Sequence, residues 1–199
     1  MADSSLILAS SSIYRQRQLA QLGLSFVAHS PKTKEDLRPG ETPHDRALRL
    51  SQEKAQSLRQ DHPQAWILGS DQVCSCAGQI LRKPGSLSKQ QQHLQHLAGK
   101  EVSFHTAVAL CGPQGELEAR EVLTLARMRS LATAEITAYV EREPAADCAG
   151  GFKVEGLGIR LFDWIRSDDP TALVGLPLIA CGQLIRQYLP QLWTRFAAA

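Results

Sequence analysis

The fold class is decided by the stretch Leu6-Ile7-Leu8-Ala9-Ser10-Ser11-Ser12. Its apolar half predicts a short buried strand, and serine is a residue type that favours helix N-caps. From Ile13 to Leu22 the apolar residues recur with helical spacing, and Gly23 is a natural helix end. These residues therefore predict a strand, a serine turn and a helix in succession.

Strand and helix signals alternate along the rest of the chain, which predicts an α/β protein with some antiparallel pairing. Thr42-Pro43 opens a helix that we expect to run to about residue 60, and Ser88 is the expected cap of a glutamine-rich helix to about 97. With no repeat and no long linker, we expect one domain over 1–199 with a core at about 6–190. The other expected elements are strands at 26–29 and 66–70, hairpins over 73–81 (turning at 77–78) and over 102–110 with 116–128, helices from 133 to before 144 and over 176–188, and a tail at 194–199.

Bulk composition narrows the functional classes. The net charge of the 199 residues is +2, and the basic residues are dispersed among acids. This pattern argues against a nucleic-acid partner, whereas a small anionic ligand remains compatible. No stretch resembles a signal peptide or approaches the roughly 20 apolar residues of a membrane span, so we expect no membrane partner and a cytoplasmic location. The oligomeric state is left open, and a homodimer is one option.

The five cysteines are odd in number and lack CxxC spacing. Cys74-Ser75-Cys76 alternates as a strand does, which places two thiols on one face. They are either half of a soft-metal site or small reduced core residues. The second interpretation is favoured because further ligand pairs are missing.

The serine turn has the form of an anion site. Free N–H groups of a first helical turn point outward, and the helix dipole favours negative charge there. Ser10 adds a hydroxyl group, and Arg15 falls on the helix face that should be buried, where a guanidinium needs an anionic partner or must reach outward. Taken alone, a capped helix with a surface arginine explains these residues better than a phosphate site.

Two lysines strengthen the phosphate hypothesis. Lys54 aligns with Ala47, Leu50 and Leu58, so its ammonium falls on the apolar stripe of its helix. Lys83 precedes a proline in a rigid loop. Each lysine alone is better explained as a stem that covers the core while its ammonium reaches water. Together with the serine turn, they predict a polyphosphate ligand.

Two carboxylates are candidates for catalysis. Asp71 follows the expected strand at 66–70, and α/β proteins place ligand-binding groups at strand ends. Glu35 lies in a polar loop. In a polyphosphate hydrolase such a pair would hold a divalent ion, and one of them would accept a proton from the attacking water. The alternative for Asp71 is an ordinary turn aspartate.

Six short segments stand in order along the chain: Leu8-Ala9-Ser10-x-Ser12-x-x-Arg15, Lys54-Ala55, Ser70-Asp71-Gln72, Lys83-Pro84, Ala149-Gly150-Gly151-Phe152 and Val174-Gly175-Leu176-Pro177. Over about residues 6–188 they resemble the signature blocks of the Maf family of nucleoside-triphosphate pyrophosphatases. The resemblance implies a Maf/ITPase-like fold, in which a long mixed, twisted sheet is flanked by helices and the active site lies in a central cleft.

By the same resemblance, the reaction is hydrolysis between the α and β phosphates of a nucleotide with Mg²⁺ or Mn²⁺. Asp71 would be the proton acceptor, and Glu35 would join it at the metal. The phosphates would be held by Ser10, Arg15, Lys54 and Lys83. The family often has an acidic pair at position 35, whereas Lys34 precedes Glu35 here, so Asp71 is the firmer of the two metal ligands.

Three residues fall where the family separates its substrate subgroups: Tyr14, Gln72 and Glu155. An aromatic residue, glutamine and glutamate resemble the 7-methyl-GTP subgroup, although tryptophan is more usual than tyrosine. A guanine methylated at N7 is cationic, so stacking on an aromatic ring gains about 0.5–2 kcal/mol. A carboxylate can accept from its N1–H and amine. The alternatives are a dTTP/UTP-type pyrophosphatase and a non-catalytic nucleotide-binding regulator of cell division, which would not need Asp71 beside phosphates.

Overall fold

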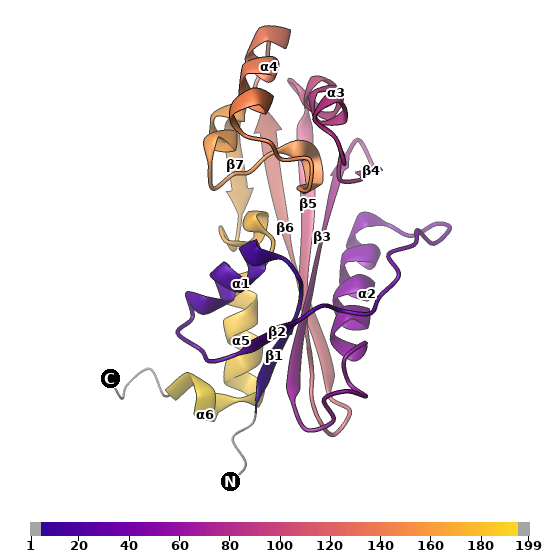
Figure 1. The fold of residues 1–199 in the computed structure, drawn as a ribbon, viewed down its shortest axis with the longest axis vertical. Coiled ribbons are helices and arrows are strands. Elements are labelled where there is room, and N and C mark those ends of the chain that lie inside the picture. Colours follow the sequence, from indigo (N-terminus) through magenta and orange to yellow (C-terminus); the bar gives the residue numbers. More distant parts are fainter. Residues whose placement is uncertain (1–4, 195–199) are drawn as a thin grey trace.

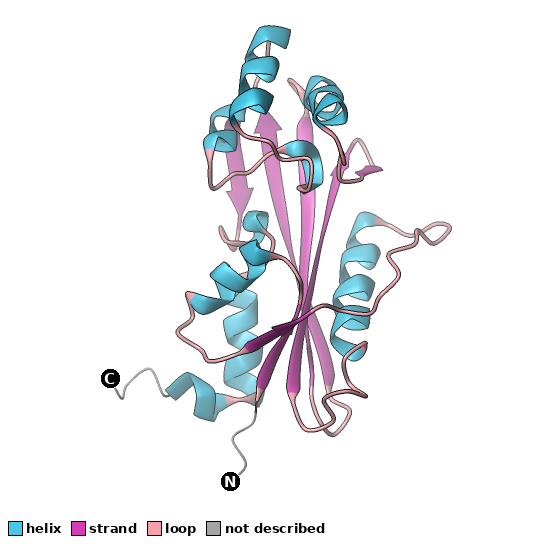
Figure 2. Ribbon diagram, viewed as in Figure 1, coloured by secondary structure: helices cyan, strands magenta, loops and turns pink. Residues whose placement is uncertain are grey.

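A computed structural model describes residues 5–194 and shows one twisted, mixed sheet of seven strands with helices on both faces (Figures 1 and 2). Six strands lie in the order β2-β1-β3-β5-β6-β7, and β4 pairs with β3 outside this path. The strands are β1 Leu6–Ala9, β2 Val27–His29, β3 Trp66–Cys76, β4 Gln79–Leu81, β5 Glu101–Cys111, β6 Leu117–Met128 and β7 Phe162–Ser167.

Six α-helices and three 3-10 helices complete the described residues. The serine and threonine N-caps expected from the sequence are present, because Ser12 accepts from the N–H of Arg15 and Thr42 accepts from that of Asp45. None of these helices is long and apolar enough to cross a membrane. The bounds are α1 Ile13–Ala20, α2 Pro43–Gln56, α3 Leu87–Leu97, α4 Thr133–Arg142, α5 Leu178–Tyr188 and α6 Pro190–Trp193, with η1 Ala149–Gly151, η2 Leu157–Leu161 and η3 Ala172–Val174.

Alternation of side chains along the strands divides the core between the two faces of the sheet. Leu8 and Leu68 face α1 and α5, where they join a cluster with Leu19 and Leu184. Their neighbours in sequence face α2 instead, as Ile67 does. A third cluster packs α3 and α4 against the far ends of β3, β5 and β6, at the top of Figure 1.

Pairing along β3 leaves a gap that positions the site. The parallel strand β1 pairs with β3 up to Ala9 opposite Gly69, and β4 pairs with β3 from Cys74 onward. Among the described residues, no strand therefore covers this edge of β3 from 70 to 73. The other edge pairs with β5 throughout, so β3 stays extended here.

Gly69 brings α2 unusually close to the sheet. A Cβ at this position would lie 2.1 Å from the carbonyl oxygen of Ser51 and 2.5 Å from the backbone nitrogen of Ala55, both on α2. Only a residue without a side chain fits such an approach. Asp71, two residues further along β3, points to the same face and therefore also faces α2.

Most expected elements are confirmed, including the turn at Ala77-Gly78, where both φ angles are positive. The prediction that this strand ends at residue 70 was wrong. β3 runs to Cys76, because antiparallel pairing with β5 continues past the polar residues. Ser86, not Ser88, caps α3. The helix expected to reach residue 60 ends at Gln56, and the last long helix begins at 178 rather than 176.

Strand β7 was not predicted. Among residues 5–194 it pairs with β6 alone, and it has little apolar alternation because most of its residues are partly or fully exposed at the edge of the sheet. The tail expected at 194–199 lies, beyond 194, outside the described residues. Cys74 and Cys76 lie on β3 as expected, and all five cysteines are unpaired.

Candidate active site

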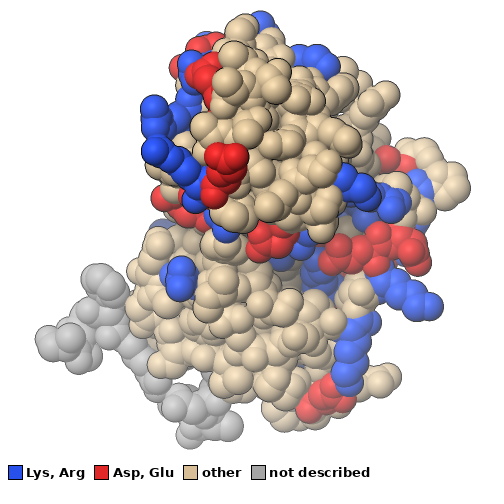
Figure 3. Space-filling model, turned by 45° about the horizontal axis from the view of Figure 1, so that its top comes forward, with Lys and Arg blue, Asp and Glu red and all other residues tan. Residues whose placement is uncertain are grey.

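A cavity of about 370 Å³ opens at the uncovered edge of β3. Its volume is in the range of small-molecule sites. Because the edge is free, side chains from both faces of the strand reach it: Asp71 from the α2 side and Gln72 from the other. Figure 3 shows acidic and basic side chains gathered around the hollow between the two ends of the molecule. The expected central cleft is therefore present.

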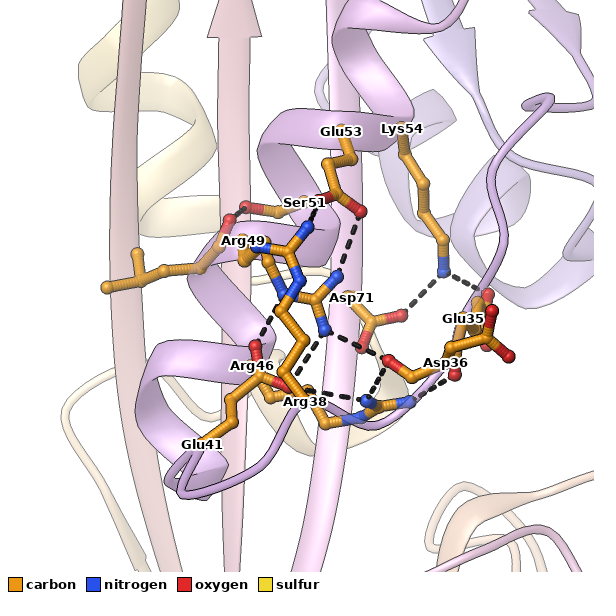
Figure 4. Close-up of polar contacts among 11 residues, drawn as sticks. Glu35, Asp36, Arg38, Glu41, Arg46, Arg49, Ser51, Glu53, Lys54 and Asp71 are labelled. Carbon is orange, nitrogen blue, oxygen red and sulfur yellow. Dashed lines mark hydrogen bonds and ion pairs between the residues drawn. The ribbon is translucent and has the colours of Figure 1, made fainter.

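Lys54 joins the two candidate carboxylates in this cavity. Its Nζ lies 2.6 Å from Asp71 Oδ1 and 2.6 Å from Glu35 Oε1 (Figure 4). Lys54 is 4% exposed and Asp71 6%, whereas more than half of the Glu35 side chain is accessible. A lysine on the apolar stripe of α2 thus has two anionic partners, which offset the cost of burying its charge.

The carboxylate of Glu35 is held ionised by its surroundings. Desolvation is the largest influence and acts to raise its pKa, but the hydrogen bond and charge of Lys54, with the charges of Lys83 and Arg15, outweigh it and lower the pKa. Carboxylate oxygens such as those of Glu35 and Asp71 are hard donors of the kind Mg²⁺ and Mn²⁺ select. Glu35 and Asp71 therefore fit a divalent metal.

Arg46, which was not predicted as a site residue, fixes the loop that carries Glu35. Its guanidinium donates to the backbone carbonyls of Glu35 at 2.6 Å and Asp36 at 3.0 Å, and it lines the cavity (Figure 4). Arg46 precedes Leu50 and Lys54 by four and eight residues, so it shares their helix face. The helix-face position that marks Lys54 as unusual therefore marks Arg46 in the same way.

A second arginine ties the end of the same loop to α2. Arg49 donates two hydrogen bonds to the carboxylate of Glu41 and one to Glu53 at 2.9 Å, and Glu53 also pairs with Arg38. The hydrogen bond from Arg49 is the largest influence on Glu41 and lowers its pKa to about 2, against opposing desolvation. Bidentate pairs of this kind are directional as well as strong, so they hold the loop in one place.

Arg15 is positioned by a turn from the other end of the chain. Its Nε donates to the carbonyl of Gly175 at 2.9 Å, and the hydroxyl of Ser70 donates to the same oxygen at 3.0 Å. Gly175 has a φ of +125°, which favours glycine. Burial lowers the pKa of Arg15, while the charges of Asp71 and Glu35 act to raise it. Arg15 therefore lines the cavity within reach of the charges of both carboxylates.

The turn containing Gly175 is itself anchored by a buried carboxylate. Asp169 is 1% exposed and accepts from the N–H of Thr171 at 3.1 Å and from that of Ile179 at 2.7 Å. The second bond satisfies a free N–H in the first turn of α5. This arrangement gives the Asp169-Pro170-Thr171 segment a structural role.

The other predicted phosphate ligands differ in position. Ser12 lines the cavity, whereas Ser10 is buried, is not among the lining residues, and accepts from the N–H of Ser12 at 3.1 Å. Lys83 is exposed and lines the cavity, and its charge, like that of Arg15, acts to lower the pKa of Glu35. The structure therefore brings Arg15, Lys54 and Lys83 together around the acids and places Ser10 behind the turn.

The three predicted specificity residues all line the cavity. The Nζ of Lys153 lies 5.7 Å from the ring centroid of Tyr14. Gln72 donates from Nε2 to the carbonyls of Ala172 at 2.9 Å and Leu173 at 3.1 Å. These two acceptors use the amide donors of Gln72, so its carbonyl oxygen is the atom left to contact a ligand.

Cys148 also lines the cavity, but its chemistry does not suit a nucleophile. Desolvation raises the pKa of its thiol to about 12, and Asp147 adds to the shift. Because the thiolate is the reactive form, this cysteine is protonated and inert at neutral pH. The chemistry of the cavity therefore rests on its carboxylates and cations.

A family model described as Maf-like protein matches residues 5–188. The chain therefore belongs to the Maf family. A protein of Xanthomonas axonopodis pv. citri named 7-methyl-GTP pyrophosphatase is 51% identical over 92% of this chain and 95% of its own length. A protein of Bordetella pertussis with the same name is 45% identical over 92% of each chain.

The solved structure of the Staphylococcus aureus Ham1 protein has a similar fold. It matches with a TM-score of 0.55 and 10% identity, over 94% of this chain and 99% of that one. At this identity the likeness concerns the fold alone. The expected single α/β domain with a mixed sheet flanked by helices is confirmed.

Proposed function

We propose that this chain is a metal-dependent nucleotide pyrophosphatase that hydrolyses the α–β phosphoanhydride of 7-methyl-GTP, or of a related modified nucleotide, to the monophosphate and pyrophosphate. One observation carries the proposal: Glu35 and Asp71 share one cation at the uncovered edge of β3. Arg15 and Lys83 flank them in the same cavity. Curated relatives with 45–51% identity bear the matching name.

Each polar group at the phosphate end has a proposed role. Glu35 and Asp71 hold Mg²⁺ or Mn²⁺, which when bound neutralises phosphate charge and activates water. Asp71 accepts the proton of the attacking water. Arg15, Lys54 and Lys83 bind phosphate oxygens, and such fixed charges stabilise the charge that develops in the transition state. Ser10 supports the turn, because its hydroxyl oxygen accepts a hydrogen bond from the backbone N–H of Ser12. Ser12 lines the cavity, so its hydroxyl is the nearer of the two to the ligand.

At the base end we assign recognition to Tyr14, Gln72 and Glu155. The cationic methylated guanine stacks on the face of Tyr14 that Lys153 does not cover, with a gain of about 0.5–2 kcal/mol. Glu155 accepts from the N1–H and exocyclic amine of the base. Gln72 contributes only its carbonyl oxygen, because its donors hold the 172–173 turn. The proposed place of action is the cytoplasm, where nucleoside triphosphates are present.

The test measures pyrophosphate release with Mg²⁺ or Mn²⁺ from 7-methyl-GTP, GTP, dTTP, UTP and CTP. We expect 7-methyl-GTP to be turned over fastest and Asp71→Asn to lose at least about a hundredfold in kcat, as removal of a general base does. Asp163→Asn, an exposed acid on β7, is the matched control and should behave as wild type. Melting curves establish that both variants are folded.

Three outcomes would contradict parts of the proposal. Nucleotide binding with no release from any substrate would make the chain a binder rather than an enzyme. Release from dTTP or UTP but not from 7-methyl-GTP would refute the base assignment. Full activity of Asp71→Asn would refute the role of the carboxylate.

A further inference from the structure

A second cluster of ligand groups lies outside the cavity. His44, His105 and Glu121 each offer one atom, and these atoms all lie within 4.8 Å of one another. The Nδ1 of His105 is 2.7 Å from Glu121 Oε1, and the Nδ1 of His44 is 3.6 Å from Glu121 Oε2. None of the three is among the residues that line the cavity.

The fold brings these residues together from three elements. His105 lies on β5, and Glu121 on β6 pairs with Ala107, two residues along from His105. His105 and Ala107 share a face, so His105 and Glu121 are diagonal neighbours. The start of α2, which carries His44, packs on this face, where Ala47 contacts the cluster around Ala107.

We propose that His44, His105 and Glu121 form a binding site for Zn²⁺, separate from the divalent-metal site at Glu35 and Asp71. Two imidazole nitrogens and one carboxylate are a known zinc ligand set that leaves a fourth position for water. Mg²⁺ selects oxygen ligands and retains its own water, so it does not favour such a set. The chain would thus keep its two metals apart by ligand type.

The consequence of binding would be a cross-link between α2 and the sheet. Zinc would tie the first turn of α2 to β5 and β6. Arg46, two residues after His44, holds the backbone of Glu35 and Asp36. A fixed first turn would therefore hold the loop that carries Glu35. The bare hydrogen bond between His105 and Glu121 is the competing explanation, and it needs neither zinc nor His44.

The test is zinc binding, measured by competition with a chromogenic chelator and by dialysis with metal analysis. It uses no nucleotide, so its outcome is independent of the proposed function. We expect one zinc ion per chain in wild type and in Asp71→Asn. His44→Ala, His105→Ala and Glu121→Gln should each weaken binding at least about tenfold, since even outer-shell changes have effects of that size.

His62→Ala is the matched control. His62 stacks on His29 with ring centroids 4.7 Å apart, and neither belongs to a cluster of three ligand groups within the described residues. The control should bind zinc as wild type does. Zinc at about 100 times its Kd should also raise the Tm of wild type by roughly 5–10 °C, and should raise that of His44→Ala by less.

Cobalt substitution identifies the ligand types. Nitrogen and oxygen ligation should give visible d–d bands without the near-ultraviolet charge-transfer band of a thiolate. His44 is exposed, so His44→Ala should fold, and circular dichroism checks this. Absence of zinc binding, a thiolate band, or undiminished binding in both folded histidine variants would overturn the proposal.

Discussion

Replacing Gly69 by alanine should test how the fold aligns the site. The added methyl group would lie 2.1 Å from the carbonyl oxygen of Ser51 and 2.5 Å from the nitrogen of Ala55. Both are backbone atoms of α2, so no side chain can move aside. To restore ordinary contact distances, α2 must retreat from β3 by about 1 Å.

Two effects follow from that retreat. Overpacking of this size costs about 1–3 kcal/mol, which for a chain of this length lowers Tm by roughly 2–12 °C. Lys54 precedes Ala55 on the displaced segment, and its Nζ now lies 2.6 Å from Asp71 Oδ1. A shift of about 1 Å at a catalytic group costs up to about a hundredfold in rate. We therefore expect Gly69→Ala to lose about 10–100-fold in kcat for pyrophosphate release.

Calorimetry and the pyrophosphate assay measure the two effects, with Gly78→Ala as control. Gly78 sits in the turn after β3 with a φ of +77°, and nothing lies within 4 Å of a Cβ built there. The control should lose about 1–2 kcal/mol through backbone strain alone and keep its kcat. If Gly69→Ala has the Tm and the kcat of wild type, the close approach of α2 does not align the site.

Two further predictions concern individual carboxylates. Glu155→Gln should lower kcat/KM for 7-methyl-GTP about tenfold more than for GTP. Both bases offer the same N1–H and amine, but only the methylated ring is cationic, and its attraction to the carboxylate is worth about 1.5 kcal/mol. Equal losses for both nucleotides would mean that Glu155 does not sense the charge of the methylated base. The pKa of Glu41 is lowered to about 2, first by its hydrogen bond from Arg49. Its stabilising effect is therefore complete above its unfolded-state pKa near 4.5 and is lost as the pH falls toward 2. In Glu41→Gln the unfolding free energy from urea titrations should fall less steeply between pH 4.5 and 2, and an unchanged slope would contradict the role of this pair.

The sequence marked Lys54 as a charged residue on an apolar helix stripe, and the structure shows that its partners are Glu35 and Asp71. A charged residue on an apolar helix stripe must have a partner or reach water, so periodicity alone marks it. The anion that Lys54 contacts depends on the close approach of α2 to β3 at Gly69. No local sequence pattern predicts that approach. Arg46 shares the stripe and could have been found by the same reasoning.

For Asp71, in contrast to Lys54, the position predicted from the sequence was wrong. The sequence placed it at a strand end, whereas it lies inside β3. It reaches the cavity because β1 stops pairing at Gly69 and β4 starts at Cys74. Where a neighbouring strand ends is decided by pairing between distant segments, so local propensity predicted the residue but not the reason for its access.

Sequence by itself determined the α/β class and most elements, and it predicted the residues proposed for the phosphate and base sites. The class and the elements depend on hydrophobic period, capping and turn residues, which act over a few neighbours along the chain. The base-site residues were predicted from the family resemblance. Only the tertiary structure decided the uncovered edge of β3, the shared ammonium of Lys54, and the meeting of His44, His105 and Glu121. Those features join segments far apart in sequence, and their geometry follows from sheet register and helix packing.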